Sequence, residues 1–221
     1  MAMYKDIALA VEGGGMRGAY SAGVLDVFLD NGIKFGACAG TSAGATHLCS
    51  YLSEQRERNK RLDTIHSASK RYMSWGNLIR TGDFFALDYC YNQIPRVVDP
   101  FDFERFRENT AETKFYAVAT NLETGSPEYL LTRDLDKPED MDKIRASASL
   151  PLMSHIVEVE GMKLLDGGVG DSIPFEVFTG MGYQKQVVIV TQPEGFVKKP
   201  NSMIPLFKIF YRKYPKFIEA A

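Results

Sequence analysis

The sequence predicts a single α/β domain of three layers, in which helices cover both faces of a largely parallel central sheet. Short apolar runs typical of buried strands alternate along the chain with segments of helical period, which favours strands joined by covering helices. Of the 221 residues, 45% are hydrophobic and 24% are charged, which is the balance of a globular domain with one substantial core. The sequence contains no internal repeat and no linker.

The N-terminal quarter predicts the order strand, turn, helix, strand, turn, helix. The apolar run at 6–11 predicts a buried strand that leads into three glycines. A helix with its apolar side chains on one face follows, and Asn31-Gly32 is a typical stop signal. A second strand is predicted over 33–39, and a second helix extends to about Leu52.

The middle of the chain carries fewer regular patterns. The charged stretch 54–71 predicts a helix, whereas 74–100 is rich in Gly, Asp and aromatic residues and predicts irregular structure. Strands at 114–120 and 128–132 flank a Thr-Gly-Ser-Pro turn, and 138–149 predicts a helix with a proline in its first turn.

The last part of the chain predicts a second hairpin and then helix, strand and helix. The expected elements are strands at 155–159 and 162–165 around Glu160-Gly161, a short helix after Pro174, a strand over 186–191 and a terminal helix from about Ser202. Because strands and helices interleave throughout, we expect the sheet to be mostly parallel.

Composition excludes several classes of function. With 26 Lys+Arg against 28 Asp+Glu the net charge is −2, so the chain lacks the basic field that would make nucleic acid a partner. Cys38, Cys49 and Cys90 are odd in number and form no C-x-x-C pair, which indicates a reducing compartment and no disulfide scaffold. No apolar stretch approaches the roughly 20 residues of a membrane span. We therefore expect a cytoplasmic protein, with membrane contact that is at most peripheral.

The first predicted strand leads into Gly13-Gly14-Gly15-Met16-Arg17-Gly18, which matches the pattern G-x-G-x-x-G. A dinucleotide site needs an acidic residue at the end of the second strand, about 20 residues on, but that strand ends in Ala39-Gly40-Thr41-Ser42. A Walker phosphate loop is excluded because no Gly-Lys-Ser/Thr follows the glycines. The pattern therefore indicates backbone N–H groups at a helix N-terminus, with Arg17 beside them, that hold negative charge.

The segment Gly40-Thr41-Ser42-Ala43-Gly44 is G-x-S-x-G between a predicted strand and a predicted helix. In that context the glycines allow a sharp turn, which lifts Ser42 Oγ out of the sheet and aims the N–H of Ala43 at the same point. The segment predicts a nucleophilic serine.

A nucleophilic serine needs a base. The chain has three histidines, which we interpret as ordinary surface or core residues because no acid with a strand-end context completes a triad: His47, His66 and His155. Asp166 is the better candidate, since it ends a predicted strand and Gly167-Gly168 would let the backbone turn sharply after it. Taken alone, Asp166 would be part of a plain Asp-Gly turn.

Together and in this order, the three motifs resemble those of patatin-like phospholipases, whose hydrolases carry a G-G-G-x-R-G anion loop, a G-x-S-x-G elbow and a D-G-A/G turn. The resemblance spans about residues 6–191. In addition, Ala146-Ser147-Ala148-Ser149-Leu150-Pro151 is similar to the family's Ala- and Ser-rich segment that precedes the acidic strand. The resemblance implies a patatin-like fold and a Ser–Asp dyad without histidine, in which Ser42 is the nucleophile and Asp166 accepts its proton.

The resemblance also assigns the other site residues. The oxyanion loop carries over to Gly13, Gly14, Gly15 and Arg17, and the N–H of Ala43 completes it. The remaining motif glycines are Gly18, Gly40, Gly44, Gly167 and Gly168. The expected reaction is acyl transfer from a lipid ester, with no cofactor and no metal. Apart from the resemblance, five apolar side chains either line an acyl groove or belong to the core: Phe84, Phe85, Leu87, Tyr89 and Tyr91.

We expect residues 1–195 to form the catalytic domain and 196–221 a basic, aromatic helix, shortened from a longer chain because it stops without a capping Gly or Pro. The side chains that suggest contact with an anionic lipid surface are Lys198, Lys199, Lys208, Arg212, Lys213 and Lys216, interleaved with Phe207, Phe210, Tyr211, Tyr214 and Phe217. A helix that packs these aromatic rings on the domain is the alternative.

Two other functions remain open from the sequence. A hydrolase of short soluble esters or thioesters would share every motif, and would lose activity as the acyl chain lengthens. A catalytically idle module could use the glycine loop to bind an anionic ligand.

Overall fold

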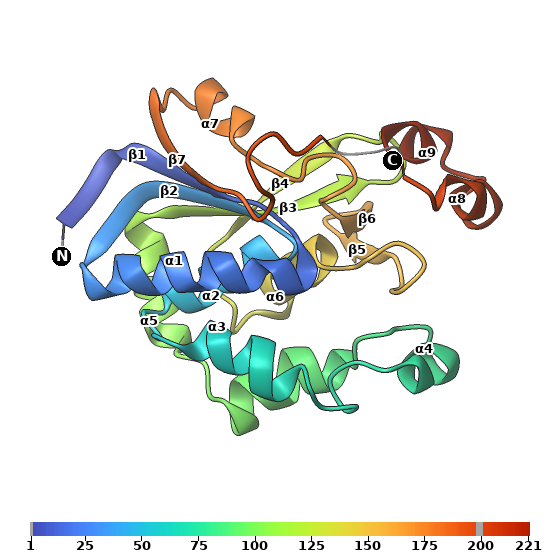
Figure 1. The fold of residues 1–221 in the computed structure, drawn as a ribbon, viewed down its shortest axis with the longest axis horizontal. Coiled ribbons are helices and arrows are strands. Elements are labelled where there is room, and N and C mark those ends of the chain that lie inside the picture. The colour runs from blue at the N-terminus through green and yellow to red at the C-terminus, as the bar shows by residue number, and fades with distance from the viewer. Residues whose placement is uncertain (1, 198–200) are drawn as a thin grey trace.

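The computed structural model of the chain describes residues 2–197 and 201–221. In this part of the chain, seven strands form one mixed sheet in the order β5-β6-β3-β2-β1-β7, and β4 pairs with β3 outside this order (Figure 1). The strands are β1 (Ala2–Val11), β2 (Ile33–Thr41), β3 (Lys114–Asn121), β4 (Pro127–Thr132), β5 (Val157–Val159), β6 (Met162–Asp166) and β7 (Lys185–Ile189). The predicted α/β domain is therefore confirmed.

Four strands, β1, β2, β3 and β7, pair in parallel, and β4, β5 and β6 join them in antiparallel pairs. Both antiparallel hairpins that the sequence predicts are present. The turn between β5 and β6 consists of Glu160 and Gly161, whose φ angles of 52° and 78° are of the kind that two-residue hairpins require.

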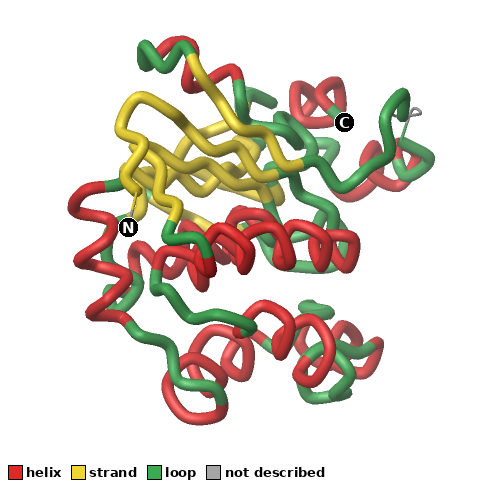
Figure 2. The backbone as a smooth tube through the Cα atoms, turned by 60° about the vertical axis from the view of Figure 1, so that its left-hand side comes forward, coloured by secondary structure: helices red, strands yellow, loops and turns green. Residues whose placement is uncertain are grey.

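Helices cover the two faces of the sheet unequally (Figures 1 and 2). The larger layer consists of α1 (Ala19–Asp30), α2 (Ala43–Leu52), α5 (Phe103–Glu112) and α6 (Pro138–Ser147). It encloses the main core, in which Leu9, Leu48 and Phe115 are completely buried. On the other face, α7 (Glu176–Gly180) places Phe178 over a patch of strand alanines. The small alanine side chains let this short helix approach the sheet closely.

The segment 54–100 differs from its prediction. The helix expected over 54–71 is reduced to α3 (Arg58–Arg61) and a π-helical turn at Leu62–His66. Conversely, the stretch expected to be irregular contains α4 (Trp75–Thr81) and a π-helical segment at Tyr89–Val98. The ends of α4 are set by local chemistry: the Ser74 side chain caps it by accepting from Asn77 N at 3.1 Å, and Gly82 ends it with a φ of 82°.

The C-terminal segment forms two short helices, α8 (Ile204–Phe210) and α9 (Pro215–Ala220), instead of the single predicted one. Pro215 favours a new first turn over continuation of α8, because proline lacks the N–H that a helix interior needs. Within the residues that the structure describes, no helix combines the length and apolar character that a membrane crossing requires.

Three of the aromatic residues expected to face lipid belong to the core. Phe207, Tyr211 and Phe217 are buried against Leu122 and Leu165, so the alternative of rings packed on the domain is correct for them. Phe210 is 68% exposed. Lys198 and Lys199 lie outside the described residues.

Replacing Phe217 by alanine should destabilise the protein strongly. The ring is completely buried and lies 5.9 Å from Phe207 in a stacked arrangement, so its removal leaves a cavity. We expect the free energy of unfolding, measured in urea, to fall by about 3 to 5 kcal/mol. The matched control Phe210→Ala removes an exposed ring and should change it by less than about 0.5 kcal/mol. Equal losses in both variants would contradict the buried placement.

Candidate active site

Ser42 occupies a strained turn between β2 and α2. Its φ and ψ are 55° and −120°, a conformation that side chains rarely adopt. The turn is possible because glycines flank it. A Cβ at Gly40 would lie 2.6 Å from Ala45 N, and one at Gly44 would overlap the carbonyl oxygen of Val11. The structure therefore has the sharp turn that the sequence predicts, with backbone packed closely on both sides of it.

Strand β3 brings the serine and the aspartate together. Thr41, the last residue of β2, pairs with Val118, and Asp166, the last residue of β6, pairs with the next residue, Ala119. Strand β4 occupies the opposite edge of β3, so β2 and β6 point toward each other along one edge. Ser42 therefore lies beside Asp166, although 124 positions separate them in the chain.

The two side chains are hydrogen-bonded directly. Ser42 Oγ donates to Asp166 Oδ2 at 2.6 Å, and Gly168 N donates to Asp166 Oδ1 at 2.7 Å. Only 4% of Asp166 is exposed, so water competes little for the carboxylate. A short O–H···O⁻ bond in such surroundings is among the stronger hydrogen bonds of proteins, and it aims the serine proton at the carboxylate.

Ser147, which our sequence reasoning left without a role, supports the elbow from α6. Its Oγ accepts from Ser42 N at 2.9 Å and donates to Val118 O at 2.6 Å. Two residues later, Ser149 O accepts from Asp166 N at 2.8 Å. The Ala- and Ser-rich segment thus fixes the backbone of both partners. Its small hydroxyl residues, in a helix that ends beside the acidic strand, were the signal available in the sequence.

The glycine-rich turn lies next to Ser42, but its N–H groups differ in availability. Gly13 N donates to Ser172 O at 3.1 Å, which removes Gly13 from the possible oxyanion donors. Among residues 2–197 and 201–221, no acceptor is paired with the N–H groups of Gly14, Gly15 and Ala43. Gly15 and Ala43 line the same cavity as Ser42. The structure thus leaves three of the four predicted backbone donors available.

Arg17 lies beside this turn. A Cβ built on Gly14 would be 3.4 Å from both the Arg17 guanidinium and Arg17 Cβ, and the Arg17 side chain is exposed. The cation is therefore close enough to the turn to act on negative charge held there.

Glu12, a second residue without a role in our sequence reasoning, anchors the turn. This buried carboxylate accepts hydrogen bonds from both the N–H and the hydroxyl of Thr191, just beyond β7. A Cβ at Gly14 would lie 2.7 Å from Thr191 Oγ1, so the anchor also explains the glycine there. The available signal was a charged residue placed directly after a buried strand.

The segment that follows Asp166 joins the parts of the site. Asp171 O accepts from Thr41 Oγ1 at 2.9 Å, and Ser172 O accepts from Gly13 N. Gly167 permits this path, since a Cβ there would overlap the carbonyl oxygen of Val118. The glycines of the Asp-Gly-Gly motif are thus required by close backbone contact.

None of the histidines is hydrogen-bonded to Ser42. Each is paired with a carboxylate: His47 Nε2 lies 3.1 Å from that of Asp63, His66 Nε2 3.4 Å from that of Asp99, and His155 Nδ1 2.8 Å from that of Asp83. His47 does line the cavity, and its ring explains Gly18, whose Cβ would lie 2.7 Å from His47 Cε1. This supports the interpretation of the histidines as structural.

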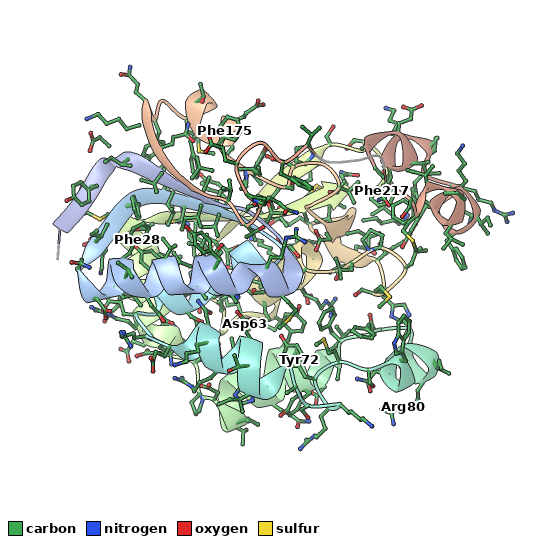
Figure 3. All side chains as sticks on the ribbon, in the orientation of Figure 1. Phe28, Asp63, Tyr72, Arg80, Phe175 and Phe217 are labelled. Carbon is green, nitrogen blue, oxygen red and sulfur yellow. The ribbon has the colours of Figure 1, made fainter. Side chains whose placement is uncertain are left out.

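A cavity of about 350 Å³ extends from Ser42, and its size is at the lower end of small-molecule sites. Of the five predicted groove residues, Phe85 and Tyr91 line it, whereas Phe84, Leu87 and Tyr89 do not. Further apolar side chains of the wall are Met73, Ile94, Leu135, Met141 and Ile144. Asp63 and Tyr72, labelled in Figure 3, come from the segment that covers the cavity.

The cavity wall also contains two thiols. Burial raises the pKa of Cys49 and of Cys90 to about 12, so both are protonated at neutral pH and are poor nucleophiles. Burial likewise raises the pKa of Tyr72 and Tyr91. Within the described part of the chain, no three His, Cys, Asp or Glu side chains gather as a metal site would need.

Replacing Gly44 by alanine should distort the elbow. The new Cβ would overlap backbone oxygens of Val11 and Glu12, which cannot rotate away as a side chain would. We expect the free energy of unfolding, measured in urea, to fall by about 1 to 3 kcal/mol. A fluorophosphonate probe, which reacts with activated serines, should then no longer label Ser42. Gly23→Ala is the matched control, because nothing lies near its Cβ on the exposed face of α1. This change should stabilise the protein by about 0.5 to 1 kcal/mol. Unchanged stability in Gly44→Ala would refute the crowding.

Comparison with known proteins gives consistent matches. A family model described as patatin-like phospholipase matches residues 9–179. The uncharacterized protein YjjU of Escherichia coli (strain K12) is 31% identical over 201 residues, which are 88% of this chain and 54% of that protein. The uncharacterized NTE family protein Rv1063c of Mycobacterium tuberculosis is 26% identical over 189 residues, 83% of this chain and 48% of that one. Lysophospholipase nte1 of Aspergillus fumigatus is 27% identical over 184 residues, 80% of this chain and 11% of that protein.

The chain thus spans about half the length of the two bacterial relatives and a small part of the fungal one. The family match begins within β1 and ends within α7, so it includes the glycine-rich turn, the elbow and Asp166. Because this match covers most of the chain, the chain belongs to the family of patatin-like phospholipases.

Proposed function

We propose that the chain is a serine acyl hydrolase that cleaves carboxylic esters of lipids through an acyl-Ser42 intermediate, with Asp166 as the base. The observation that carries this proposal is the 2.6 Å hydrogen bond from Ser42 Oγ to Asp166 Oδ2, at a largely apolar cavity. Membership of a phospholipase family and the name of the fungal relative, a lysophospholipase, support a lipid ester as substrate.

In the first half of the reaction, Ser42 Oγ attacks the ester carbonyl carbon while its proton passes to Asp166 Oδ2. The carbonyl oxygen becomes an oxyanion, which the N–H groups of Gly14, Gly15 and Ala43 would stabilise. Collapse of this intermediate breaks the bond to the alcohol, which leaves with the proton from Asp166. The acyl group is then esterified to Ser42.

In the second half, a water molecule attacks the acyl carbon and gives its proton to Asp166. The same N–H groups stabilise the second oxyanion, and collapse releases the fatty acid as the proton returns to Ser42 Oγ. Arg17, beside the glycine-rich turn, would support the turn electrostatically or meet a lipid phosphate. A buried carboxylate is the base throughout, and no imidazole takes part.

We also propose a cytoplasmic location. Cys38, Cys49 and Cys90 are all free thiols, and Cys38 and Cys49 are buried in the domain. Free thiols are typical of a reducing compartment.

Removing Ser42 should abolish hydrolysis, and removing the Asp166 carboxylate should slow it strongly. Ser42→Ala should lose both ester hydrolysis and labelling by a fluorophosphonate probe, and Asp166→Asn should lower kcat by on the order of 10² to 10⁴ because the proton acceptor is lost. His155→Gln is the control, since this exposed histidine pairs with Asp83 away from Ser42. If Asp166→Asn retains the wild-type rate, another group is the base. A folded wild-type chain that the probe does not label would be an idle binding module.

The cavity should set the preferred acyl length. In a series of nitrophenyl esters, kcat/KM should rise from acetyl to medium-chain substrates, since each methylene that enters the cavity leaves water. Met73→Trp should shift the optimum to shorter chains by filling the cavity, whereas Ile65→Trp, exposed and outside the lining, should not. A steady fall of kcat/KM with chain length would identify a hydrolase of short soluble esters instead.

A further inference from the structure

Two short helices at one end of the molecule expose large apolar side chains. On α4, Trp75 is 67% exposed and Ile79 is 87% exposed. On α8, Ile209 and Phe210 are 65% and 68% exposed. Figure 1 shows both helices projecting at the same end of the molecule, on either side of β5 and β6. Trp75 packs edge-on against Phe84, with 5.4 Å between the ring centroids, and still keeps two thirds of its surface exposed.

The segment between Leu150 and Ile156 joins the two helices into one surface. On one side, Phe84 N donates to Met153 O at 2.8 Å, just beyond α4. On the other, Leu152 N donates to Tyr211 Oη at 2.8 Å, at the end of α8. The side chains of Leu150 and Ile156 are themselves more than a third exposed. We define the α4–α8 face by six residues: Trp75, Ile79, Leu150, Ile156, Ile209 and Phe210.

This face adjoins the cavity that contains Ser42. Met73 and Phe85 pair as a β-bridge at the base of α4, and both line the cavity. Leu150 belongs both to the cavity wall and to the α4–α8 face. A substrate that entered from this face would therefore reach the acyl cavity directly.

The two helical segments that carry the face bear more basic than acidic side chains, although the whole chain has a net charge of −2. Arg80, labelled in Figure 3, lies on α4, and Lys208, Arg212, Lys213 and Lys216 are exposed on and after α8. Residues 201–221 contain four basic side chains, Lys208 to Lys216, and a single acidic one, Glu219. Exposed apolar side chains with exposed cations on the same helical segments are complementary to a bilayer with anionic head groups.

We infer that the α4–α8 face is a docking surface for an anionic lipid bilayer, on which Trp75, Ile79, Ile209 and Phe210 enter the interface and the surrounding cations meet the head groups. This differs from the C-terminal helix expected from the sequence, because Phe207, Tyr211 and Phe217 are core residues and α4 supplies two of the six residues of the face. The benefit of docking for catalysis rests on the proposed lipid hydrolysis, whereas binding itself does not.

The test is co-sedimentation of the Ser42→Ala chain with vesicles, which separates binding from hydrolysis. The chain should bind vesicles of equal parts phosphatidylcholine and phosphatidylglycerol more tightly than vesicles of phosphatidylcholine alone, and added salt should weaken the difference. Adding Ile79→Asp and Ile209→Asp should weaken binding by at least about tenfold, because two apolar contacts become charged. Val27→Asp, at an exposed valine of α1 outside the face, should bind like the parent.

The outcomes are distinguishable. Wild-type binding in the Ile79→Asp/Ile209→Asp chain, or no preference for anionic vesicles, would overturn the inference. A concentration-dependent dimer that these substitutions dissociate, without vesicle binding, would assign the face to a second copy of the chain and also overturn it. With Ser42 intact, the doubly substituted enzyme should hydrolyse a soluble short ester at the wild-type rate and lose activity only on vesicles. Failure to hydrolyse any ester would count against the proposed function and leave the binding result standing.

Discussion

The site depends on the edge of β3, where β2 and β6 end against each other. Parallel pairing with β2 and antiparallel pairing with β6 place Thr41 and Asp166 opposite consecutive residues of β3. That geometry holds Ser42 Oγ 2.6 Å from the carboxylate without any intervening ring. A one-residue shift in either register would turn a side chain to the other face of the sheet and separate the pair.

Around this point the backbone is crowded, and the crowding makes the site rigid. Gly40, Gly44 and Gly167 each stand where a Cβ would press on main-chain atoms. The strained φ of Ser42 is maintained because Ser147 accepts its N–H and ties it to β3. In the proposed reaction, a serine held in this way needs little rearrangement before attack, which is how preorganised sites lower a barrier. These glycines are therefore needed because they leave room for close backbone contact, and not because they make the chain flexible.

The cavity has a different construction. Its floor belongs to α2 and α6 of the main layer, whereas its cover comes from the segment around Tyr72, Phe85 and Tyr91, outside the sheet. This cover carries α4, so the same segment that lines the cavity also presents Trp75 and Ile79 to the outside. The proposed acyl cavity and the proposed docking face thus share one part of the molecule.

The sequence by itself determined the order of strands and helices outside 54–100 and the C-terminal segment, the two hairpins, and the residue types of the turn, the elbow and the Asp-Gly-Gly segment. These features follow from local requirements. The spacing of apolar residues sets helix or strand, and glycine is needed where two backbone segments lie close together, so neighbouring residues in the sequence reveal both. The pairing of Ser42 with Asp166 could be expected only because the motifs occurred together in a pattern already associated with one site.

Only the tertiary structure decided which groups are engaged elsewhere. Gly13 N donates to Ser172 O, and the carboxylate of Glu12 accepts from Thr191. The rings of Phe207 and Phe217 are buried in the core. Each of these contacts joins residues far apart in the chain, and its free energy depends on how whole elements pack. Local patterns carry no information about such distant partners, which is why availability of a donor or exposure of a ring had to be read from the fold.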